Sequence, residues 1–174
     1  MRKIWRSGII YYWSWIFSRS CQHVGTGLQI LNRCQLSVSG KMEVGNNFYV
    51  RSNKYNPVEI SVSSGACLKI GDDTFLNQGV RIACSKEIYI GNNCLIGDEC
   101  VILDTDYHAA PNGIVKTAPV IIEDNVWLAT RVIVIRGVTI GHGSIIGAGS
   151  VITKSIPPNT FAAGQPVRII KSLV

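Results

Sequence analysis

The sequence has little charge and no concentrated run of basic residues. Charged residues make up 16% and hydrophobic residues 47% of its 174 residues, a balance that excludes a disordered chain. The net charge of +6 suits an anionic partner, but the lysines and arginines are scattered, so we expect no nucleic-acid partner. The length predicts a single domain.

The sequence also lacks the cysteine spacing of a structural zinc site, because none of its six cysteines forms a C-x-x-C pair. No small-residue cleavage site follows the first apolar run, so we expect no secretory leader. We therefore expect a cytoplasmic protein whose reduced thiols serve as small apolar fillers. Cys94 and Cys100 fit this interpretation, since they stand six residues apart in a chain with a six-residue rhythm.

Residues 1–24 contain no acid and form a distinct aromatic and basic segment, which we expect to be helical. Its apolar run from Gly8 to Phe17 is shorter than the about 20 residues that span a bilayer. One interpretation places it at a membrane surface, at the inner face of the cytoplasmic membrane, with its tryptophans at headgroup depth. The other has its aromatic side chains packed against the protein body or a neighbouring subunit.

An aliphatic side chain returns every six residues along most of the chain. The longest unbroken series is Ile122, Leu128, Val134, Ile140, Ile146 and Ile152. Six is a multiple of the strand period of two, so these side chains face one side, and β-branched types favour strands. Glycines and Asn–Asp pairs mark the turns. The pattern predicts an all-β solenoid, a parallel β-helix shaped as a triangular prism with 18 residues per coil.

The repeat fails between Ile102 and Ile122, and we expect an excursion loop at about 103–119. Loops held by a rigid scaffold are a usual place for function. The predicted organisation of the chain is therefore an N-terminal segment (1–24), a β-helix that carries this loop (25–158) and a C-terminal tail (159–174).

His108 lies in the expected loop, whereas His23 and His142 fit structural or surface positions. A neutral imidazole is available at pH 7 as a general base, and Asp104 or Asp106 could orient it. An alternative is a polar loop with ordinary Asx turns. A metal site is disfavoured because no second histidine is near in sequence, so we expect no metal.

Residues 60–172 resemble a known family through the segments "DNVW", "IGAGSVITKSIPPN" and "AAGQPVRII". The region is similar to the left-handed β-helix acyltransferases of the hexapeptide-repeat superfamily. The resemblance is strongest to sugar O-acetyltransferases, which include the maltose and galactoside enzymes and those that act in lipopolysaccharide, O-antigen and capsule polysaccharide biosynthesis.

The resemblance implies a homotrimer with active sites between adjacent prisms and acetyl-CoA as co-substrate. It assigns His108 as the catalytic histidine. It also implies contacts with acetyl-CoA from Trp127, Ala129, Thr130, Ala148, Thr153, Lys154 and Arg168. Basic residues among them suit the phosphates of coenzyme A.

The sequence departs from this family at the acceptor site. The histidine loop is shorter than in the maltose and galactoside enzymes, and "DYHAAP" lacks their proline directly after the histidine. Gly79 stands where they offer an asparagine. We therefore expect Asn77, which is nearby, and Tyr107 to contact the acceptor.

The predicted function is transfer of acetyl from acetyl-CoA to a hydroxyl of a saccharide or polysaccharide precursor, with His108 as general base. Two alternatives stay open: an N-acetyltransferase acting on an amino sugar or nucleotide amino sugar, and a non-catalytic scaffold. A metalloenzyme resembling γ-class carbonic anhydrase is disfavoured, because that family needs two histidines close together in sequence.

Overall fold

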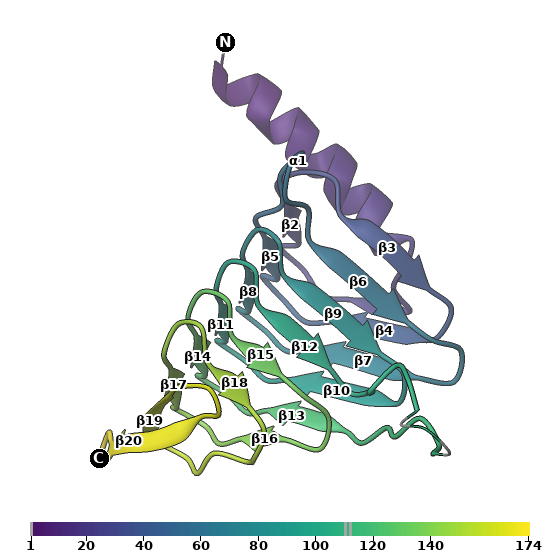
Figure 1. The fold of residues 1–174 in the computed structure, drawn as a ribbon. Helices are drawn as coiled ribbons and strands as arrows, with labels where there is room; N and C mark the ends of the chain where they lie inside the picture. Colours follow the sequence, from purple (N-terminus) through teal and green to yellow (C-terminus); the bar gives the residue numbers. More distant parts are fainter. Residues whose placement is uncertain (1, 110, 112) are drawn as a thin grey trace.

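The computed structural model describes residues 2–109, 111 and 113–174. Short strands wind into a triangular prism, one helix packs on its N-terminal end, and a hairpin extends one of its sheets at the C-terminal end (Figure 1). The predicted β-solenoid is therefore confirmed. Three parallel sheets form the faces of the prism, and the chain visits them in a fixed order in every coil.

The faces consist of short strands at successive coils. The first face contains β1 (His23–Val24), β4 (Lys41–Val44), β7 (Cys67–Ile70), β10 (Glu87–Ile90), β13 (Val120–Ile122) and β16 (Thr139–Ile140). The second contains β2 (Gln29–Ile30), β5 (Tyr49–Val50), β8 (Phe75–Leu76), β11 (Leu95–Ile96), β14 (Trp127–Leu128), β17 (Ile145–Ile146), β19 (Thr160–Ala163) and β20 (Arg168–Ser172). The third contains β3 (Gln35–Val38), β6 (Glu59–Val62), β9 (Arg81–Cys84), β12 (Val101–Leu103), β15 (Ile133–Val134) and β18 (Val151–Ile152).

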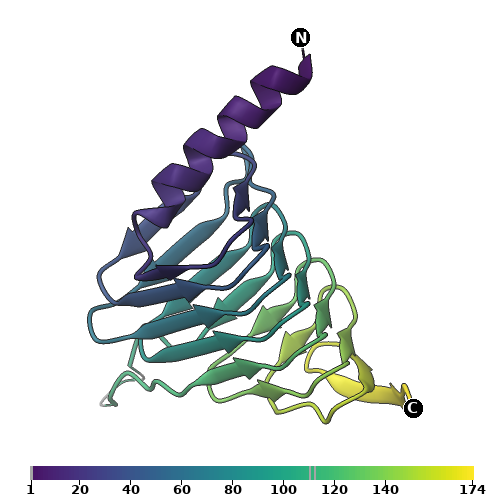
Figure 2. The same ribbon diagram turned by 180° about the vertical axis from the view of Figure 1, so that it is seen from behind.

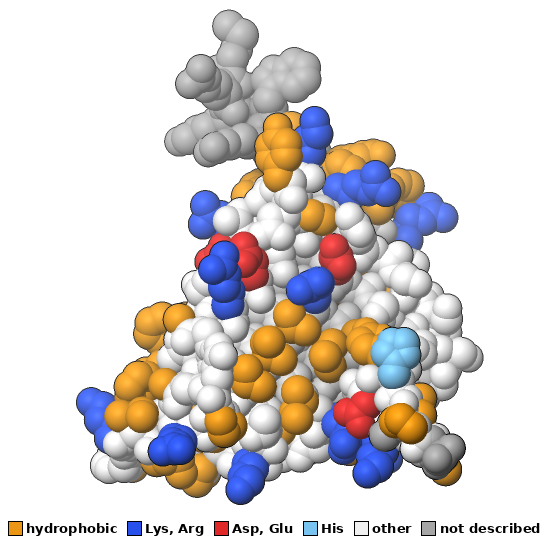
Figure 3. Space-filling model, in the orientation of Figure 1, with side chains coloured by type: hydrophobic (Ala, Val, Ile, Leu, Met, Phe, Trp, Pro, Cys, Tyr) orange, Lys and Arg blue, Asp and Glu red, His pale blue; other side chains and the backbone are white. Residues whose placement is uncertain are grey.

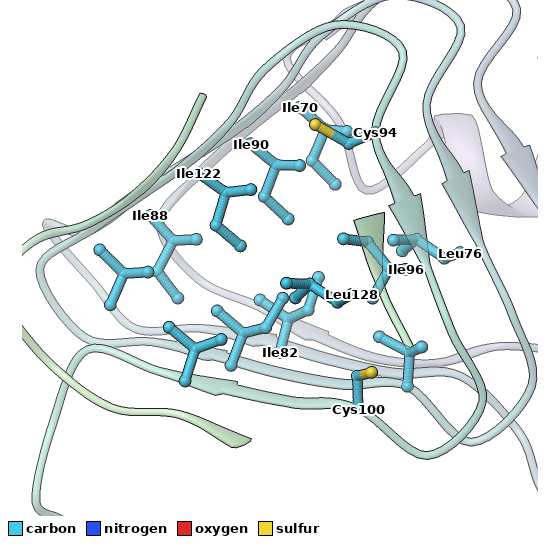
Figure 4. Close-up of a cluster of buried hydrophobic side chains, with 14 of the residues drawn as sticks. Ile70, Leu76, Ile82, Ile88, Ile90, Cys94, Ile96, Cys100, Ile122 and Leu128 are labelled. Atoms are coloured by element: carbon cyan, nitrogen blue, oxygen red, sulfur yellow. The ribbon is translucent and has the colours of Figure 1, made fainter. Parts of the chain in front are cut away.

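The repeated aliphatic residues point inward from all three faces and form one continuous core (Figure 4). Ile90, Ile96 and Ile102, from successive faces of one coil, are all fully buried. Each stacks in register on its counterpart in the next coil, as Ile96 does on Leu128. Burial of such a side chain contributes about 1.5–3 kcal/mol, so the column of stacked residues stabilises the prism along its whole length.

The prediction of 18 residues per coil holds only near the C-terminus. There, the paired residues Leu128 and Ile146 are 18 apart, but earlier stacked pairs are separated by 20 to 32 residues. One reason is that first-face strands such as β10 are four residues long and bury two side chains, Ile88 and Ile90. The others are a corner segment at 51–57 and the loop at 103–119.

The chain turns from one face to the next at three corners in each coil. In the coil that starts at β10, residues 91–94 form the first corner, 97–100 the second and 103–119 the third. The first corner is held by a ladder of side chains. Asn92 Oδ1 accepts the backbone N–H of Asp72 at 2.8 Å, and Asp124 Oδ1 accepts that of Asn92 at 2.7 Å. Each coil therefore satisfies donors of the coil before it.

Helix α1 (Arg2–Ser18) lies across the open end of the prism (Figure 2). Phe17 is buried there with its ring centroid 5.9 Å from that of Phe48, and the Ser14 hydroxyl accepts the N–H of Ile30 at 2.9 Å. One side of the segment thus packs against the protein body. No helix in the described part of the chain is long and apolar enough to cross a membrane.

The cysteines are free thiols, and three of them belong to the buried core. Cys94 and Cys100 donate to carbonyl groups of the next coil, Cys94 to Glu123 and Cys100 to Ala129. Burial raises the pKa of both thiols to about 11, because the interior disfavours a thiolate. They therefore act as apolar fillers, as predicted from their place in the repeat.

Truncation of a core side chain should cost far more stability than truncation of an outward one on the same face. Leu128→Ala removes a fully buried side chain, and we expect a loss of about 2–5 kcal/mol in the free energy of unfolding. Leu95→Ala, on the neighbouring strand but 48% exposed, should cost less than about 1 kcal/mol. Urea unfolding of both variants measures the difference, and equal losses would contradict the inward-facing column.

Candidate functional site

The excursion loop leaves the prism at the third corner, between β12 and β13. Its base is a short antiparallel hairpin, in which Thr105 bridges Thr117. The N–H of Asp106 donates to the carbonyl of Lys116 at 3.1 Å, and the N–H of Ala118 donates to the carbonyl of Asp104 at 3.0 Å. The loop therefore projects from the corner on a paired stem.

Asp104 fixes the first strand of this stem to the preceding coil. Its side chain is fully buried, and its two carboxylate oxygens accept the N–H groups of Ser85, Lys86 and Glu87, each at 2.7 Å. Charge-assisted bonds of this kind are among the stronger ones. Asp104 is thus occupied by the turn beneath the loop, and the arrangement does not fit the expectation that it orients His108.

Asp106 fixes the stem to the following coil instead. Its Oδ1 accepts from Arg136 Nε at 2.6 Å, and Arg136 belongs to the next third corner. The neighbouring Gly137 N–H also reaches back to the carbonyls of Ala118 and Pro119. The two acids predicted in this loop therefore attach it to the coils on either side.

Tyr107 and His108 follow this anchored stem. Tyr107 has a φ of 57°, a left-handed conformation that costs a non-glycine residue on the order of 1–2 kcal/mol. The His108 N–H donates to the carbonyl of Asp106 at 2.6 Å, which tightens the turn. Both side chains are exposed. Among the described residues, the imidazole has no side-chain partner, so it is free to meet a ligand.

A groove of about 610 Å³ runs along the outer surface of the third face and ends at Tyr107. It crosses β3, β6, β9 and β12. Charged side chains lie toward the helix end of this face, and apolar side chains gather in its middle (Figure 3). The groove is therefore polar near the first coils and apolar near the loop.

Sequence reasoning missed the residues that make this groove polar. They are Gln35, Ser37, Glu59, Ser61 and Arg81. They occupy the outward positions of three aligned strand sequences, QLSV, EISV and RIAC, whose second and fourth residues are largely buried. Attention to the outward residues of these strands, rather than to the buried repeat, would have found them.

The second corner holds the positions where an acceptor contact was expected. Asn77 Nδ2 donates to Asp98 Oδ2 at 2.9 Å, so its amide joins two coils. Asn77 does not line the groove that contains Tyr107. Gly79 lies against Asn56 of the corner segment 51–57, and its N–H donates to the Asn56 carbonyl at 3.0 Å. Within one chain, Asn77 and Tyr107 are therefore at different corners.

The residues predicted to contact acetyl-CoA are distributed over three places. Ala129, Thr130 and Ala148 stack at the second corner of successive coils, where the Gly149 N–H donates to the Thr130 carbonyl at 2.9 Å. Trp127 points outward from the second face and is 48% exposed. These four positions form a continuous edge of exposed and half-buried residues.

The predicted phosphate-binding residues lie in two places, after β18 and at the start of β20. Thr153 and Lys154 are exposed just after β18, at the third corner. Arg168 begins β20, which pairs antiparallel with β19 on the second face. The N–H of Val167, next to Arg168, donates to the carbonyl of Val151 at 2.9 Å, so the start of β20 lies beside β18.

The described residues leave few groups for covalent or metal chemistry. Burial raises the pKa of Cys84 to about 12, so this thiol stays protonated at neutral pH. No group of three histidine, cysteine or acidic side chains in the described ranges is arranged to hold a metal ion. His108 directly follows Tyr107, which lines the groove, and its side chain is exposed.

Comparison with known proteins identifies the class to which this architecture belongs. Residues 119–154 match the family profile described as bacterial transferase hexapeptide (six repeats). The galactoside O-acetyltransferase of Lactococcus lactis is 31% identical over 145 residues, which cover 80% of this chain and 68% of that protein. The chain belongs to the hexapeptide-repeat acyltransferase family, and the predicted left-handed β-helix is confirmed.

Another relative matches more strongly over a smaller share of its length. The galactoside O-acetyltransferase of Escherichia coli is 36% identical over 134 residues, which cover 75% of this chain. That segment is 63% of the Escherichia coli protein, so the chain spans less than two thirds of this relative.

Solved structures share the fold. A hexapeptide-repeat acetyltransferase from Vibrio cholerae, complexed with acetyl coenzyme A, has 27% identity and a TM-score of 0.60 over 90% of this chain and 74% of that one. The N-acyltransferase AntD from Bacillus cereus has a TM-score of 0.76 over 90% of this chain and 86% of that one. At 23% identity, AntD is evidence of the fold alone.

The different anchoring of the two loop acids should be measurable. Asp104→Asn places an amide N–H₂ against buried backbone donors, and we expect a loss of about 1–3 kcal/mol in the free energy of unfolding. Asp106→Asn weakens a partly exposed ion pair and should cost less than about 1 kcal/mol. Urea unfolding gives the two losses, and a harmless Asp104→Asn substitution would refute the role assigned to the buried carboxylate.

Proposed function

We propose that this protein is an acetyl-CoA-dependent O-acetyltransferase that modifies a hydroxyl of a saccharide or polysaccharide precursor. One observation carries the proposal: an exposed histidine stands on a doubly anchored loop, beside a groove that changes from polar to apolar. Family membership supports the acyl transfer, and the galactoside O-acetyltransferase relatives support a sugar hydroxyl as acceptor.

In the proposed mechanism, His108 acts as general base in a ternary complex. Its imidazole takes the proton of the acceptor hydroxyl while that oxygen attacks the thioester carbonyl carbon. A backbone N–H of a nearby coil stabilises the oxyanion of the tetrahedral intermediate. When the carbon–sulfur bond breaks, the imidazolium returns the proton to the departing thiolate. The products are an acetyl ester and free coenzyme A.

We propose that the acceptor lies in the groove of the third face, with Tyr107 at its reactive end. Carboxylate, guanidinium and hydroxyl groups of Glu59, Arg81 and Ser61 suit the hydroxyls of a sugar. Val101 and Leu103, nearer the loop, suit the apolar side of a pyranose ring. Asn56, packed on Gly79, offers a side-chain amide near the position where related sugar enzymes carry an asparagine.

We propose that the active enzyme is a homotrimer with acetyl-CoA between adjacent prisms. A shared site accounts for the distribution of the expected contacts over separate corners, because a neighbouring prism can bring one chain's edge to another chain's loop. In this arrangement Trp127, Ala129, Thr130 and Ala148 line the pantetheine. Thr153, Lys154 and Arg168 approach its phosphates, and Asp106 positions the His108 loop.

An acceptor screen tests the reaction and separates it from N-acetylation. The protein is incubated with acetyl-CoA and a panel of sugars, amino sugars and nucleotide sugars, and coenzyme A release is followed in the presence and absence of each acceptor. An ester product loses its acetyl group to hydroxylamine, whereas an amide product keeps it. A hydroxylamine-resistant product would instead identify an N-acetyltransferase.

A thermal-shift measurement separates the enzyme from a non-catalytic scaffold. A ligand that binds only the folded protein raises its apparent stability by mass action. We take stabilisation by coenzyme A as support for the enzyme, and an unchanged melting temperature at saturating coenzyme A as support for the scaffold.

Removal of the proposed base should affect turnover. We expect His108→Ala to lower kcat by about 10²–10⁴. His142→Ala is the matched control, because His142 is also exposed but lies at a first corner beside Glu123, and it should keep near-normal turnover. Steady-state kinetics with the acceptor found in the screen measures both, and near-normal turnover of His108→Ala would falsify the assignment.

Removal of the Arg81 charge from the groove should weaken binding of the acceptor but not of acetyl-CoA. Arg81→Met removes a charged donor from the groove, and we expect the acceptor KM to rise about tenfold or more, since a bond to a charged group contributes about 1.5–3 kcal/mol. Lys69→Met makes the same charge change on the exposed first face and should leave KM unchanged. Equal effects on the acceptor and acetyl-CoA KM values would argue against an acceptor groove here.

A further inference from the structure

Helix α1 presents two sides with different surroundings. Trp13, Ser14 and Phe17 face the prism and are half-buried or buried. On the opposite side, Tyr11 is 75% exposed and Tyr12 and Trp15 are each 55% exposed. The packing that closes the end of the prism therefore uses only one side of the helix.

The outward aromatic residues form a line along the helix. Gly8, Tyr11 and Trp15 follow one another at spacings of three or four residues, which places them on one side of the helix, and Arg19 directly follows the helix. The Arg19 guanidinium carbon lies 5.0 Å from the centroid of the Trp15 ring. Exposed aromatic groups gathered in this way mark an interaction surface rather than a chance distribution.

The charge of this segment indicates the kind of partner. Residues 1–24 contain four arginine or lysine residues, Arg2, Lys3, Arg6 and Arg19, and no acid. Anionic lipid attracts such a segment, and tyrosine and tryptophan suit the boundary between headgroups and acyl chains. A second copy of the same basic segment would meet it with like charge, which disfavours self-association through this side.

The length of the helix decides how it could meet a bilayer. Its 17 residues fall short of the about 20 that a spanning helix requires, and its inward side is already occupied by the prism. A helix with one aromatic side and basic residues lies along a membrane surface instead.

We propose that the outward side of α1, comprising Ile9, Tyr11, Tyr12 and Trp15, docks on an anionic lipid surface together with Arg19, which directly follows the helix. The helix then lies in the plane of the interface while the prism stands away from it. The first coil, which contributes β3 to the groove, is at the docked end. This geometry points the polar end of the groove toward the membrane. The orientation suits a lipid-linked saccharide acceptor, an inference that rests on the proposed function.

Vesicle binding tests the docking without any enzymatic reaction. The full chain is co-sedimented with vesicles of phosphatidylcholine, with and without one quarter phosphatidylglycerol, at low and physiological salt. We expect binding to the anionic vesicles that weakens as salt rises. A chain that stays in the supernatant with anionic vesicles at low salt would overturn the proposal.

Substitutions on the outward side locate the contact. The triple variant Tyr11→Ser, Tyr12→Ser, Trp15→Ser should reduce the vesicle partition coefficient by at least about tenfold. Ile170→Ser is the control, because Ile170 is 57% exposed on β20 at the opposite end of the prism (Figure 1), and it should bind like the unmodified chain. Thermal melting checks that each variant is folded. A triple variant that is folded and binds normally would overturn the assignment of this side.

Two further measurements keep the outcomes distinct. Light scattering gives the oligomeric state of the unmodified and triple-variant chains. If the unmodified chain does not bind vesicles and the triple variant forms smaller assemblies, this side of the helix is a subunit contact and the proposal is overturned. Acetyl transfer to a soluble acceptor should be equal in both chains. A triple variant that loses vesicle binding but keeps acetyl transfer supports docking. An unmodified chain that binds vesicles but transfers no acetyl group also supports docking, and it counts against the proposed reaction.

Discussion

The in-register stacking of coils is the constraint on which the rest of this structure depends. Each strand donates to and accepts from the same face of the neighbouring coils, and inward residues such as Ile96 and Leu128 lie directly on one another. A shift of one residue would turn every inward side chain outward. A single inserted residue is therefore not tolerated within a face. Strands lengthen by two residues instead, as in β10, and longer insertions lie at the corners, as at 51–57 and 103–119.

This constraint also explains how a long loop can hold the proposed base His108 in place. The stem of the 103–119 loop is attached on one side through Asp104 to the turn of the preceding coil and on the other through Asp106 to Arg136 of the following coil. The rigidity of the prism is passed to the loop by two acids, so His108 does not need a packed environment of its own. The N-terminal end of the stack is covered by helix α1, which buries Phe17 there. The other side of the helix is exposed.

The sequence predicted the fold well because the repeated inward residues have no freedom to vary in type. It predicted the loop from the interruption of that repeat. The role of His108 in that loop stays a prediction. It did not predict the coil lengths, because four-residue strands such as β10 bury two residues and imitate a slip in the repeat. The role of Asp104 was also out of reach, since its partners are backbone groups of a turn about twenty residues earlier.

The sequence by itself determined the period, the inward residues and the position of the loop, because these follow from local alternation and from composition. Only the tertiary structure decided which outward side chains meet. Arg81, Glu59 and Ser61 come from different coils and form one groove because parallel stacking places equal positions side by side. The placement of Asn77 and Tyr107 at different corners is likewise set by the prism, because the chain turns at a separate corner after each face.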